Sequence, residues 1–221
     1  MRLLPVLATC STVLLAASVI AAEAQPLPAD IIASSRARVP YVQRKDSDAS
    51  AKRLFDTFVR GSNAPTDEIK GPLAFASYNP AVATALLDLH DGAVGKSSSL
   101  DAHVRELAIM VACRETNYDL EWNGHEAAAL KAGVDPKVLE LVRTRGALTG
   151  LSDADAAVIR FGRELINDRK MSPATFAKAK SLFGNKGALD LVAVMSTYAV
   201  SGFYAIAVDE QPAEGKVKLP R

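Results

Sequence analysis

The fold is decided by the stretch RELAIMVACRETNYDLEWNGH, residues 105–125. From Leu107 to Cys113 this stretch is apolar around the whole circumference of a helix, which predicts a helix that is buried on all sides. Thr116 and Asn117 then interrupt the apolar run, and a second helical pattern follows. The stretch therefore predicts a helical hairpin at the centre of the protein.

The second helix of this hairpin carries a stripe of polar and aromatic side chains. The spacing i, i+3, i+4, i+7 places four residues on one face: Tyr118, Glu121, Trp122 and His125. Glu106 is brought in by the first helix. A carboxylate is costly to bury without a partner, and a histidine can change its charge near neutral pH. The hairpin therefore indicates either a satisfied polar network or an acid–base site.

Composition limits the fold and the class of partner. Nearly half of the 221 residues are apolar and few are aromatic, which suffices for a core in one domain or in two fused helical lobes. The abundance of Ala and Leu favours an all-helical protein. The net charge is only +1, and Lys and Arg alternate with Asp and Glu, so nucleic acid is not an expected partner.

The N-terminus has the pattern of a signal peptide over residues 1–24. A basic start at Arg2 precedes the apolar residues 3–22, and Ala22-Glu23-Ala24 has the small-x-small form of a signal-peptidase site. We therefore predict a mature chain that begins near Gln25 and is periplasmic or secreted. An uncleaved membrane anchor is the alternative, since the apolar run approaches the roughly 20 residues of a membrane span.

Removal of this signal would leave Cys113 as the only cysteine, because Cys10 lies within it. An intrachain disulfide is then excluded even in a compartment that permits one, and stability must come from packing. Cys113 itself follows the pattern of a small buried core residue.

The mature chain divides into three parts. Residues 25–47 are rich in proline and lack a helical period, so we expect an extended arm that is mobile or lies across a neighbouring subunit. Residues 48–208 form the helical domain, and residues 209–221 form a tail. Capping residues and prolines predict helix starts at Asn79-Pro80, Asp135-Pro136, Ser152 and Ser172-Pro173, and glycines predict helix ends at Gly61, Gly133, Gly146 and Gly184.

The run 188–208 is almost wholly apolar and long enough for a membrane span. A series of polar or small residues within it favours a core helix of a bundle instead: Asp190, Ser196, Thr197, Tyr198, Ser201 and Gly202. We therefore expect no membrane association once the signal is removed. The surplus apolar surface of this helix, together with the arm, predicts a homo-oligomer.

Three interpretations of the hairpin remain open from the residues alone. The two carboxylates could simply satisfy His125 and Arg105 in a structural network. Glu-x-x-x-His with a further Glu also matches a metal-ligand spacing, although His90 and His103 lie on other faces or helices and supply no fourth ligand. The favoured interpretation is an acid–base site, in which a buried glutamate of raised pKa and a histidine exchange protons at neutral pH.

The sequence resembles the carboxymuconolactone decarboxylase family, which also contains the alkylhydroperoxidase D type. The resemblance rests on Arg105-Glu106-Leu107-Ala108, on Glu121-Trp122-x-x-His125, and on Ala129 to Val134, and it extends more loosely over residues 71–205. It implies an all-α, multihelical bundle of the alkylhydroperoxidase D-like type with a buried glutamate. It also implies assembly as a trimer or hexamer.

The resemblance separates two types of family member at the hairpin. Peroxidase-type members carry a Cys-x-x-Cys pair ahead of the histidine, and those positions are Tyr118 and Glu121 here. A dithiol mechanism needs two thiols, whereas the predicted mature chain has one. Decarboxylase-type members carry the Glu-Trp-x-x-His form that is found here.

By this resemblance His125 would be the general acid or base, Glu121 would orient or protonate it, and Glu106 would be the buried partner. The aromatic residues Trp122, Tyr118 and Tyr198 would contact the substrate. The resulting hypothesis is an exported enzyme without metal or cofactor that performs proton transfer, decarboxylation or isomerisation on a small lactone or carbonyl compound. The alternatives are a peroxidase-like antioxidant protein with Cys113 as a lone thiol, and a non-catalytic helical assembly module.

Overall fold

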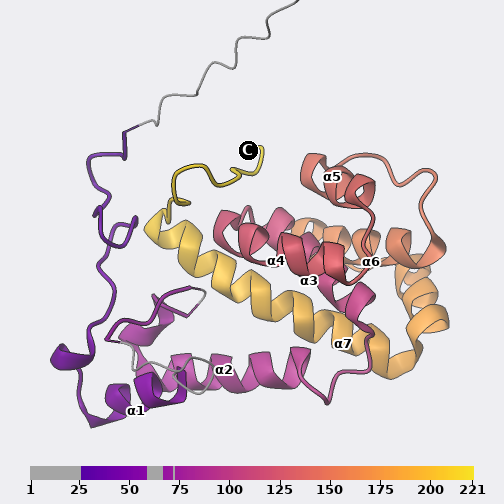
Figure 1. Cartoon of the computed structure of the whole chain (residues 1–221). Coiled ribbons are helices and arrows are strands. Elements are labelled where there is room, and N and C mark those ends of the chain that lie inside the picture. The colour runs from indigo at the N-terminus through magenta and orange to yellow at the C-terminus, as the bar shows by residue number, and fades with distance from the viewer. Residues whose placement is uncertain (1–25, 59–66, 72) are drawn as a thin grey trace, which may run out of the picture.

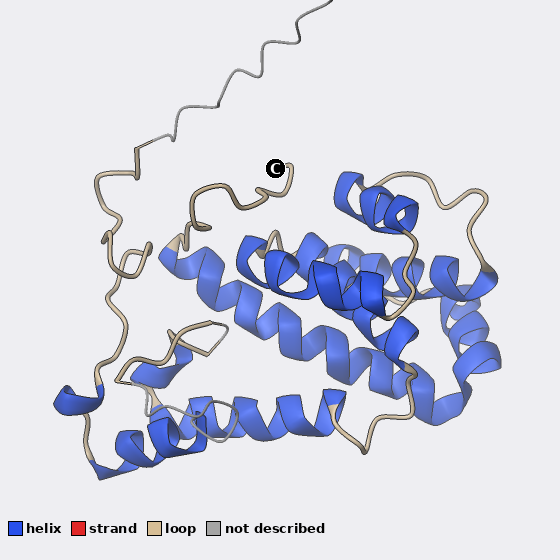
Figure 2. Ribbon diagram, in the orientation of Figure 1, coloured by secondary structure: helices blue, strands red, loops and turns tan. Residues whose placement is uncertain are grey.

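The computed structural model describes residues 26–58, 67–71 and 73–221. Helices dominate these ranges (Figures 1 and 2), and the extended pairing within them is limited to two isolated bridges, Ile32 with Ala37 and Gln43 with Glu68. The expected all-α fold is therefore confirmed. The predicted signal peptide and the predicted helix stop at Gly61 lie outside the described residues.

From α2 onward the helices follow one another with short connections. Two short 3₁₀ turns, η1 and η3, and a π-helical turn, η4, accompany them. In chain order the elements are η1 (Arg44–Asp46), α1 (Ala49–Phe58), η3 (Ala76–Tyr78), α2 (Pro80–Val94), α3 (Ala102–Glu115), α4 (Asp119–Lys131), α5 (Pro136–Thr144), α6 (Asp153–Arg163), η4 (Glu164–Asp168) and α7 (Pro173–Val208).

The expected helix starts are confirmed by side-chain caps. A carboxylate, amide or hydroxyl oxygen accepts a hydrogen bond from a backbone N–H of the first turn in α2, α5, α6 and α7, which satisfies a donor that has no partner within the helix. The capping residues are Asn79, Asp135, Ser152 and Ser172.

Helix α3 is the centre of the bundle. It packs against α4, α6 and α7, and every residue from Leu107 to Glu115 is buried. A Cβ atom at Gly162 of α6 would overlap the side chain of Val111, so a glycine permits the close approach of α6 to α3. Gly202 does the same for α7 beside Thr116. The predicted fully buried helix is confirmed.

Helix α7 crosses the whole bundle (Figure 1) and is interrupted at Gly184, whose φ of 71° and ψ of 178° are not helical. The sequence predicted a helix that ends at Gly184 and an apolar helix after residue 188. By length and composition alone α7 could cross a membrane, yet 50% of its apolar window is buried inside the fold. Its contacts with α2, α3 and α6 agree with the expected core helix of a bundle.

The N-terminal arm differs from the expectation. Instead of extending away from its own chain, it runs beside the end of α7, where the Arg38 N–H donates to the Val208 carbonyl and the Gln211 N–H donates to the Arg36 carbonyl. Ala37 is fully buried there, in a small cluster with Phe75. We expected an arm that is mobile or lies across a neighbouring subunit. The backbone hydrogen bonds to the end of α7 instead order the arm against its own chain.

Candidate functional site

Three helices meet at the candidate site. Glu106 lies on α3, His125 and Glu121 lie on α4, and Tyr198 lies on α7. The chain reverses between α3 and α4 at Asn117, which adopts a left-handed conformation with φ of 51°. The reversal packs α4 against α3 and brings the predicted stripe of α4 toward Glu106.

The imidazole of His125 is held between the two carboxylates. Its Nδ1 atom lies 3.0 Å from Glu106 Oε2, and its Nε2 atom lies 3.3 Å from Glu121 Oε2. The Tyr198 hydroxyl lies 3.2 Å from the same Nε2 atom, and the two rings meet edge to face with centroids 5.1 Å apart. The structure therefore brings Glu106, Glu121, His125 and Tyr198 together, as the sequence predicted for the hairpin residues.

The two carboxylates determine the charge of His125. Burial by itself lowers the pKa of the imidazole, but the hydrogen bonds and negative charges of Glu106 and Glu121 outweigh this effect and raise the pKa to about 9. At neutral pH His125 is therefore an imidazolium that donates from both ring nitrogens. It can release the Nε2 proton toward Glu121, whose Oε2 atom lies 3.3 Å away, and regain one afterwards.

Tyr198 remains a neutral phenol in this arrangement. Burial, followed by the negative charge of Glu121, raises the pKa of its hydroxyl above the ordinary tyrosine value. When His125 gives up its Nε2 proton, that nitrogen becomes an acceptor, and the Tyr198 O–H can donate to it. The site thus offers a hydrogen bond in both protonation states of the imidazole.

Glu106 is not the deeper of the two carboxylates, although the sequence suggested a more buried position on the central helix. The side chain of Glu106 is 14% exposed and that of Glu121 is 11% exposed. The reason is that Glu106 lies one turn from the start of α3, where the helix is not yet covered on every side.

The most buried carboxylate of these helices is Glu115, with a side chain that is 1% exposed. It lies 2.8 Å from the Arg145 guanidinium and accepts a hydrogen bond from Asn167 on the π-helical turn η4. This residue was missed in the sequence. A charged residue directly after the apolar run of α3 was the available signal, but its partners lie 30 and 52 residues away along the chain.

The other predicted aromatic contacts lie in the core. Trp122 is fully buried, and its indole N–H has no hydrogen-bond partner within the described part of the chain. Tyr118 is 2% exposed, with its pKa raised by burial and then by the negative charges of Glu210 and Glu121. Trp122 belongs to the main core cluster, and Tyr118, the residue directly before α4, packs beside Gly202 of α7.

A cavity of about 310 Å³ reaches Glu121 from the other side. Its walls come from the loop before α2, from the first turns of α4, and from the C-terminal segment, and they comprise Gly71, Leu120, Glu121, Asn123, Gly124, Pro212, Ala213 and Lys216. Glu121 is therefore the residue that links the cavity to His125.

Glu210 is a further titratable residue that the sequence did not single out, because it lies in the segment that was assigned to a tail. Burial, followed by the negative charge of Glu121, raises the pKa of its carboxyl group to about 7. Glu121 thus has acidic neighbours both in the hairpin and in the C-terminal segment.

Cys113 occupies the core of α3. Its side chain is fully buried, and burial followed by the charge of Glu121 raises its pKa well above the ordinary thiol value. Because the thiolate is the reactive form, this environment suits packing rather than nucleophilic chemistry.

The carboxylates of the hairpin do not converge on a metal position. They bind opposite ring nitrogens of His125, so the imidazole lies between them. Among the residues that the structure describes, no group of three or more His, Cys, Asp or Glu side chains is arranged to hold a metal ion.

The candidate site lies within a part of the chain that matches a known protein family. Residues 80–164, which contain Glu106, Glu121 and His125, match the carboxymuconolactone decarboxylase family. This part of the chain is a carboxymuconolactone decarboxylase domain. Helices α2 to α6 thus form the carboxymuconolactone decarboxylase core, whereas α7 and the C-terminal segment lie beyond the matched residues. No curated protein matches the chain.

Two solved structures share the fold. One is described as an alkylhydroperoxidase AhpD core, an uncharacterized peroxidase-related protein from Ralstonia eutropha JMP134; it has a TM-score of 0.63 and 17% identity, over 86% of this chain and 95% of the other. The second is the debrominase Bmp8 in complex with 2,3,4-tribromopyrrole, with a TM-score of 0.59 and 12% identity, over 80% and 91% of the two chains. At these identities the similarity establishes the alkylhydroperoxidase D-like fold alone.

The raised pKa of His125 predicts a pH-dependent stability. The folded state holds the proton more tightly than an unfolded histidine of pKa near 6.5, so this contribution is fully present below pH 6.5 and is lost as the pH rises through about 9. The loss amounts to roughly 3 kcal/mol at most. We expect the melting temperature to fall between pH 6.5 and 9, and His125→Gln to remove most of that fall. His90→Gln is the control, because the His90 side chain is 42% exposed, forms an ion pair with its neighbour Asp91, and meets the ring of Tyr198 with the centroids 6.3 Å apart, without contact to Glu106 or Glu121 in the described hydrogen bonds and ion pairs. An unchanged slope in His125→Gln would contradict the assignment.

Proposed function

We propose that this protein is an acid–base enzyme that transfers protons on a small lactone or carbonyl compound, with or without loss of CO₂, and needs no cofactor. The observation that carries the proposal is a histidine held between two carboxylates, one of which borders a cavity. Such an arrangement can store a proton and release it beside a bound molecule. The match to the carboxymuconolactone decarboxylase family supports the same class of reaction.

In this mechanism Glu121 is the group that faces the substrate. As a carboxylate it removes a proton from a carbon next to a carbonyl, and the electron pair of the broken C–H bond moves into the enolate. The proton returns from Glu121 to another carbon, which completes an isomerisation. In a decarboxylation the bond to the substrate carboxylate breaks instead, its electron pair forms the enolate, and Glu121 protonates the carbon with a proton that it receives from His125 Nε2.

His125 and Glu106 support Glu121 in this scheme. The His125 imidazolium lies 3.3 Å from Glu121 Oε2 and can recharge that carboxylate. Glu106, at 3.0 Å from Nδ1, keeps a proton on the far nitrogen and stabilises the positive charge of the ring. Tyr198 donates to Nε2 in the neutral intermediate, so the ring orientation is maintained during the exchange.

A peroxidase-like activity is the alternative. Its dithiol mechanism would need a reactive thiolate, and Cys113 is buried with a raised pKa. The peroxidase-related and debrominase descriptions belong to the two similar structures. A non-catalytic role would make the hairpin a structural network only, and the following experiment separates all three possibilities.

We expect His125→Gln to reduce turnover by about 10²-fold to 10⁴-fold, because glutamine keeps hydrogen bonding but cannot carry a proton. The assay is loss of carboxymuconolactone and of simple unsaturated lactones, together with deuterium uptake from D₂O measured by NMR. His103→Gln, whose imidazole pairs with Asp155 of α6, and Cys113→Ala are the controls and should keep the wild-type rate. A wild type without activity in these assays would support the structural network, and a His125→Gln variant of full activity would contradict the proposed role of His125. Loss of activity in Cys113→Ala alone would favour the thiol chemistry.

We further propose that the protein is exported and that cleavage occurs near Gln25, on the strength of the sequence pattern of residues 1–24. Mass spectrometry of the protein from a periplasmic fraction should give a chain that begins at or close to Gln25. A mass that includes Met1 would instead support the membrane-anchor alternative.

We also propose a homo-oligomer, a trimer or hexamer by resemblance. Helix α7 supports this proposal, because its outer face exposes Leu189 to 60%, Phe203 to 57% and Ile206 to 54%, and exposed apolar patches of this kind often mark protein contacts. Sedimentation at micromolar concentration should show an assembly, and Phe203→Glu should weaken it. Asp88→Glu on α2 is the control. A wild-type protein that sediments as one monomeric species would refute the proposal.

A further inference from the structure

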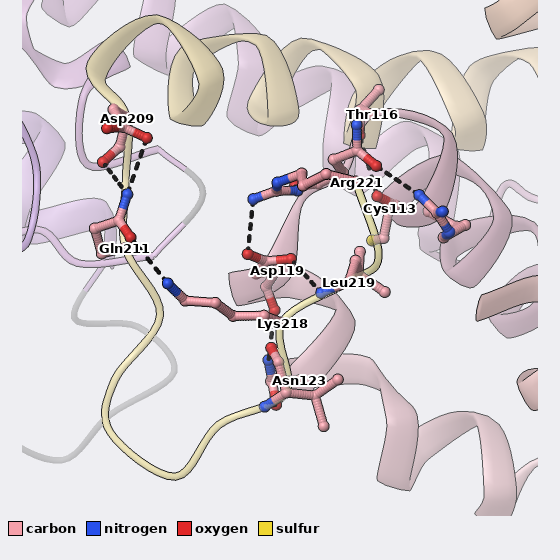
Figure 3. A network of polar contacts seen from close by, with 12 residues as sticks. Cys113, Thr116, Asp119, Asn123, Asp209, Gln211, Lys218, Leu219 and Arg221 are labelled. Atoms are coloured by element: carbon pink, nitrogen blue, oxygen red, sulfur yellow. Dashed lines mark hydrogen bonds and ion pairs between the residues drawn. The ribbon is translucent and has the colours of Figure 1, made fainter. Parts of the chain in front are cut away.

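The C-terminal segment after α7 lies along helix α4, although it falls outside the residues that match the family (Figure 3). The side chain of Asn123 holds it by two hydrogen bonds, since its amide donates to the Val217 carbonyl and its oxygen accepts from the Val217 N–H, both at 2.9 Å. A side-chain amide that pairs with both backbone groups of one residue fixes the register of that segment on α4.

Asp119 fixes the segment a second time, one turn earlier on α4. Its side chain is 3% exposed, and its two oxygens accept from the Leu219 N–H and from the Arg221 guanidinium, both at 2.9 Å. Leu219 itself is 2% exposed and belongs to the main core cluster. Release of the segment would leave a buried carboxylate without these partners, which is costly, so the segment is a fixed part of the fold.

This fixed segment forms one wall of the cavity at Glu121. Pro212, Ala213 and Lys216 stand on one side, and Leu120 and Glu121 of α4 stand on the other. The wall is largely apolar, and its charged groups are the Lys216 ammonium and the Glu121 carboxylate. The cavity is therefore suited to a molecule with an apolar body and a single anionic group.

Gly124 supplies the space for such a molecule. It lies inside α4, where glycine costs about 1 kcal/mol relative to alanine. A Cβ atom at this position would meet no atom within 4 Å, so packing does not require the glycine. Its position on the cavity wall gives it a different role, because any larger side chain would reduce the space beside Glu121.

Lys216 is free to bind a ligand. Its backbone N–H donates to the Ala213 carbonyl, which forms the turn that presents the side chain. Within the described part of the chain its ammonium group has no ion-pair or hydrogen-bond partner, whereas the nearby Lys218 donates to Gln211 Oε1 at 3.3 Å. The two lysines thus form a natural pair for comparison.

We propose that the C-terminal segment is the specificity wall of the site, and that Lys216 recognises an anionic group of a ligand whose apolar part lies against Leu120, Pro212 and Ala213. Such a ligand presents its other end to Glu121. The inference rests on the proposed function only for the chemical role of Glu121, since binding at this wall requires no turnover.

Benzoate is a suitable probe, because it combines a small apolar ring with one carboxylate, and benzyl alcohol is its neutral counterpart. We would titrate both into the purified full chain and follow the backbone amide signals of Gly124 and Ala213 by NMR at low salt. The wild type should bind benzoate more tightly than benzyl alcohol. Lys216→Gln should weaken benzoate binding by about threefold to fivefold, the range for a solvent-exposed charge contact, and leave benzyl alcohol unchanged. Lys218→Gln should behave as the wild type.

Gly124→Leu tests whether the probes bind in this cavity, because it places a large side chain on the α4 side of the cavity. It should keep or raise the melting temperature, because leucine favours the helix, and it should abolish the binding of both probes. The matched control is Gly92→Leu on α2, where a Cβ atom also meets no atom within 4 Å. Probe binding that survives in Gly124→Leu, equal benzoate affinities of Lys216→Gln and Lys218→Gln, or absence of benzoate binding to the wild type would each overturn the proposal. These outcomes do not depend on the activity of His125→Gln. The proposed ligand binding at the C-terminal segment can therefore be refuted independently of the proposed acid–base mechanism.

Discussion

The enclosure of α3 by α4, α6 and α7 is the constraint on which the rest of the structure depends. The apolar residues of α3 leave no wet face, so the neighbouring helices must approach it closely, and Gly162 and Gly202 allow them to do so. This packing sets a low-polarity environment in which Glu106 and Glu121 act on His125 with little screening by water. The same packing brings Glu106 and Glu121 to the imidazole, and their hydrogen bonds and negative charges raise the pKa of His125 against the opposing effect of burial.

Three carboxylates of α3 and α4 have different roles, since two of them contact His125 and one holds the bundle together. Glu106 and Glu121 both contact His125, and the proposed proton transfer rests on these contacts. Glu115, at the other end of α3, binds Arg145 and Asn167 and ties the central helix to the connection after α5 and to the π-helical turn. One buried carboxylate therefore stabilises the bundle, whereas the pair nearer solvent remains available for chemistry.

The sequence predicted the features that depend on local patterns. The burial of α3 follows from its uninterrupted apolar run, and the helix starts follow from caps such as Asn79 and Ser152, because each interaction lies within one turn. The stripe of α4 likewise required only helical spacing. The partners of Glu115, the position of Glu210 and the docking of the C-terminal segment were not predicted. They arise from contacts between residues that are tens of positions apart, and no periodicity in the chain records such contacts.

Cys113, the one cysteine within the described residues, can report on the opening of the core. It lies in the last turn of α3 with no exposed surface, so a thiol reagent can reach it only when the surrounding helices separate. The rate of its modification therefore measures how often the core opens, and its dependence on denaturant distinguishes a local fluctuation from global unfolding. Cys113 is poorly suited to redox chemistry because it is buried. For the same reason its modification reports the opening of the helices around α3, on which the site is assembled.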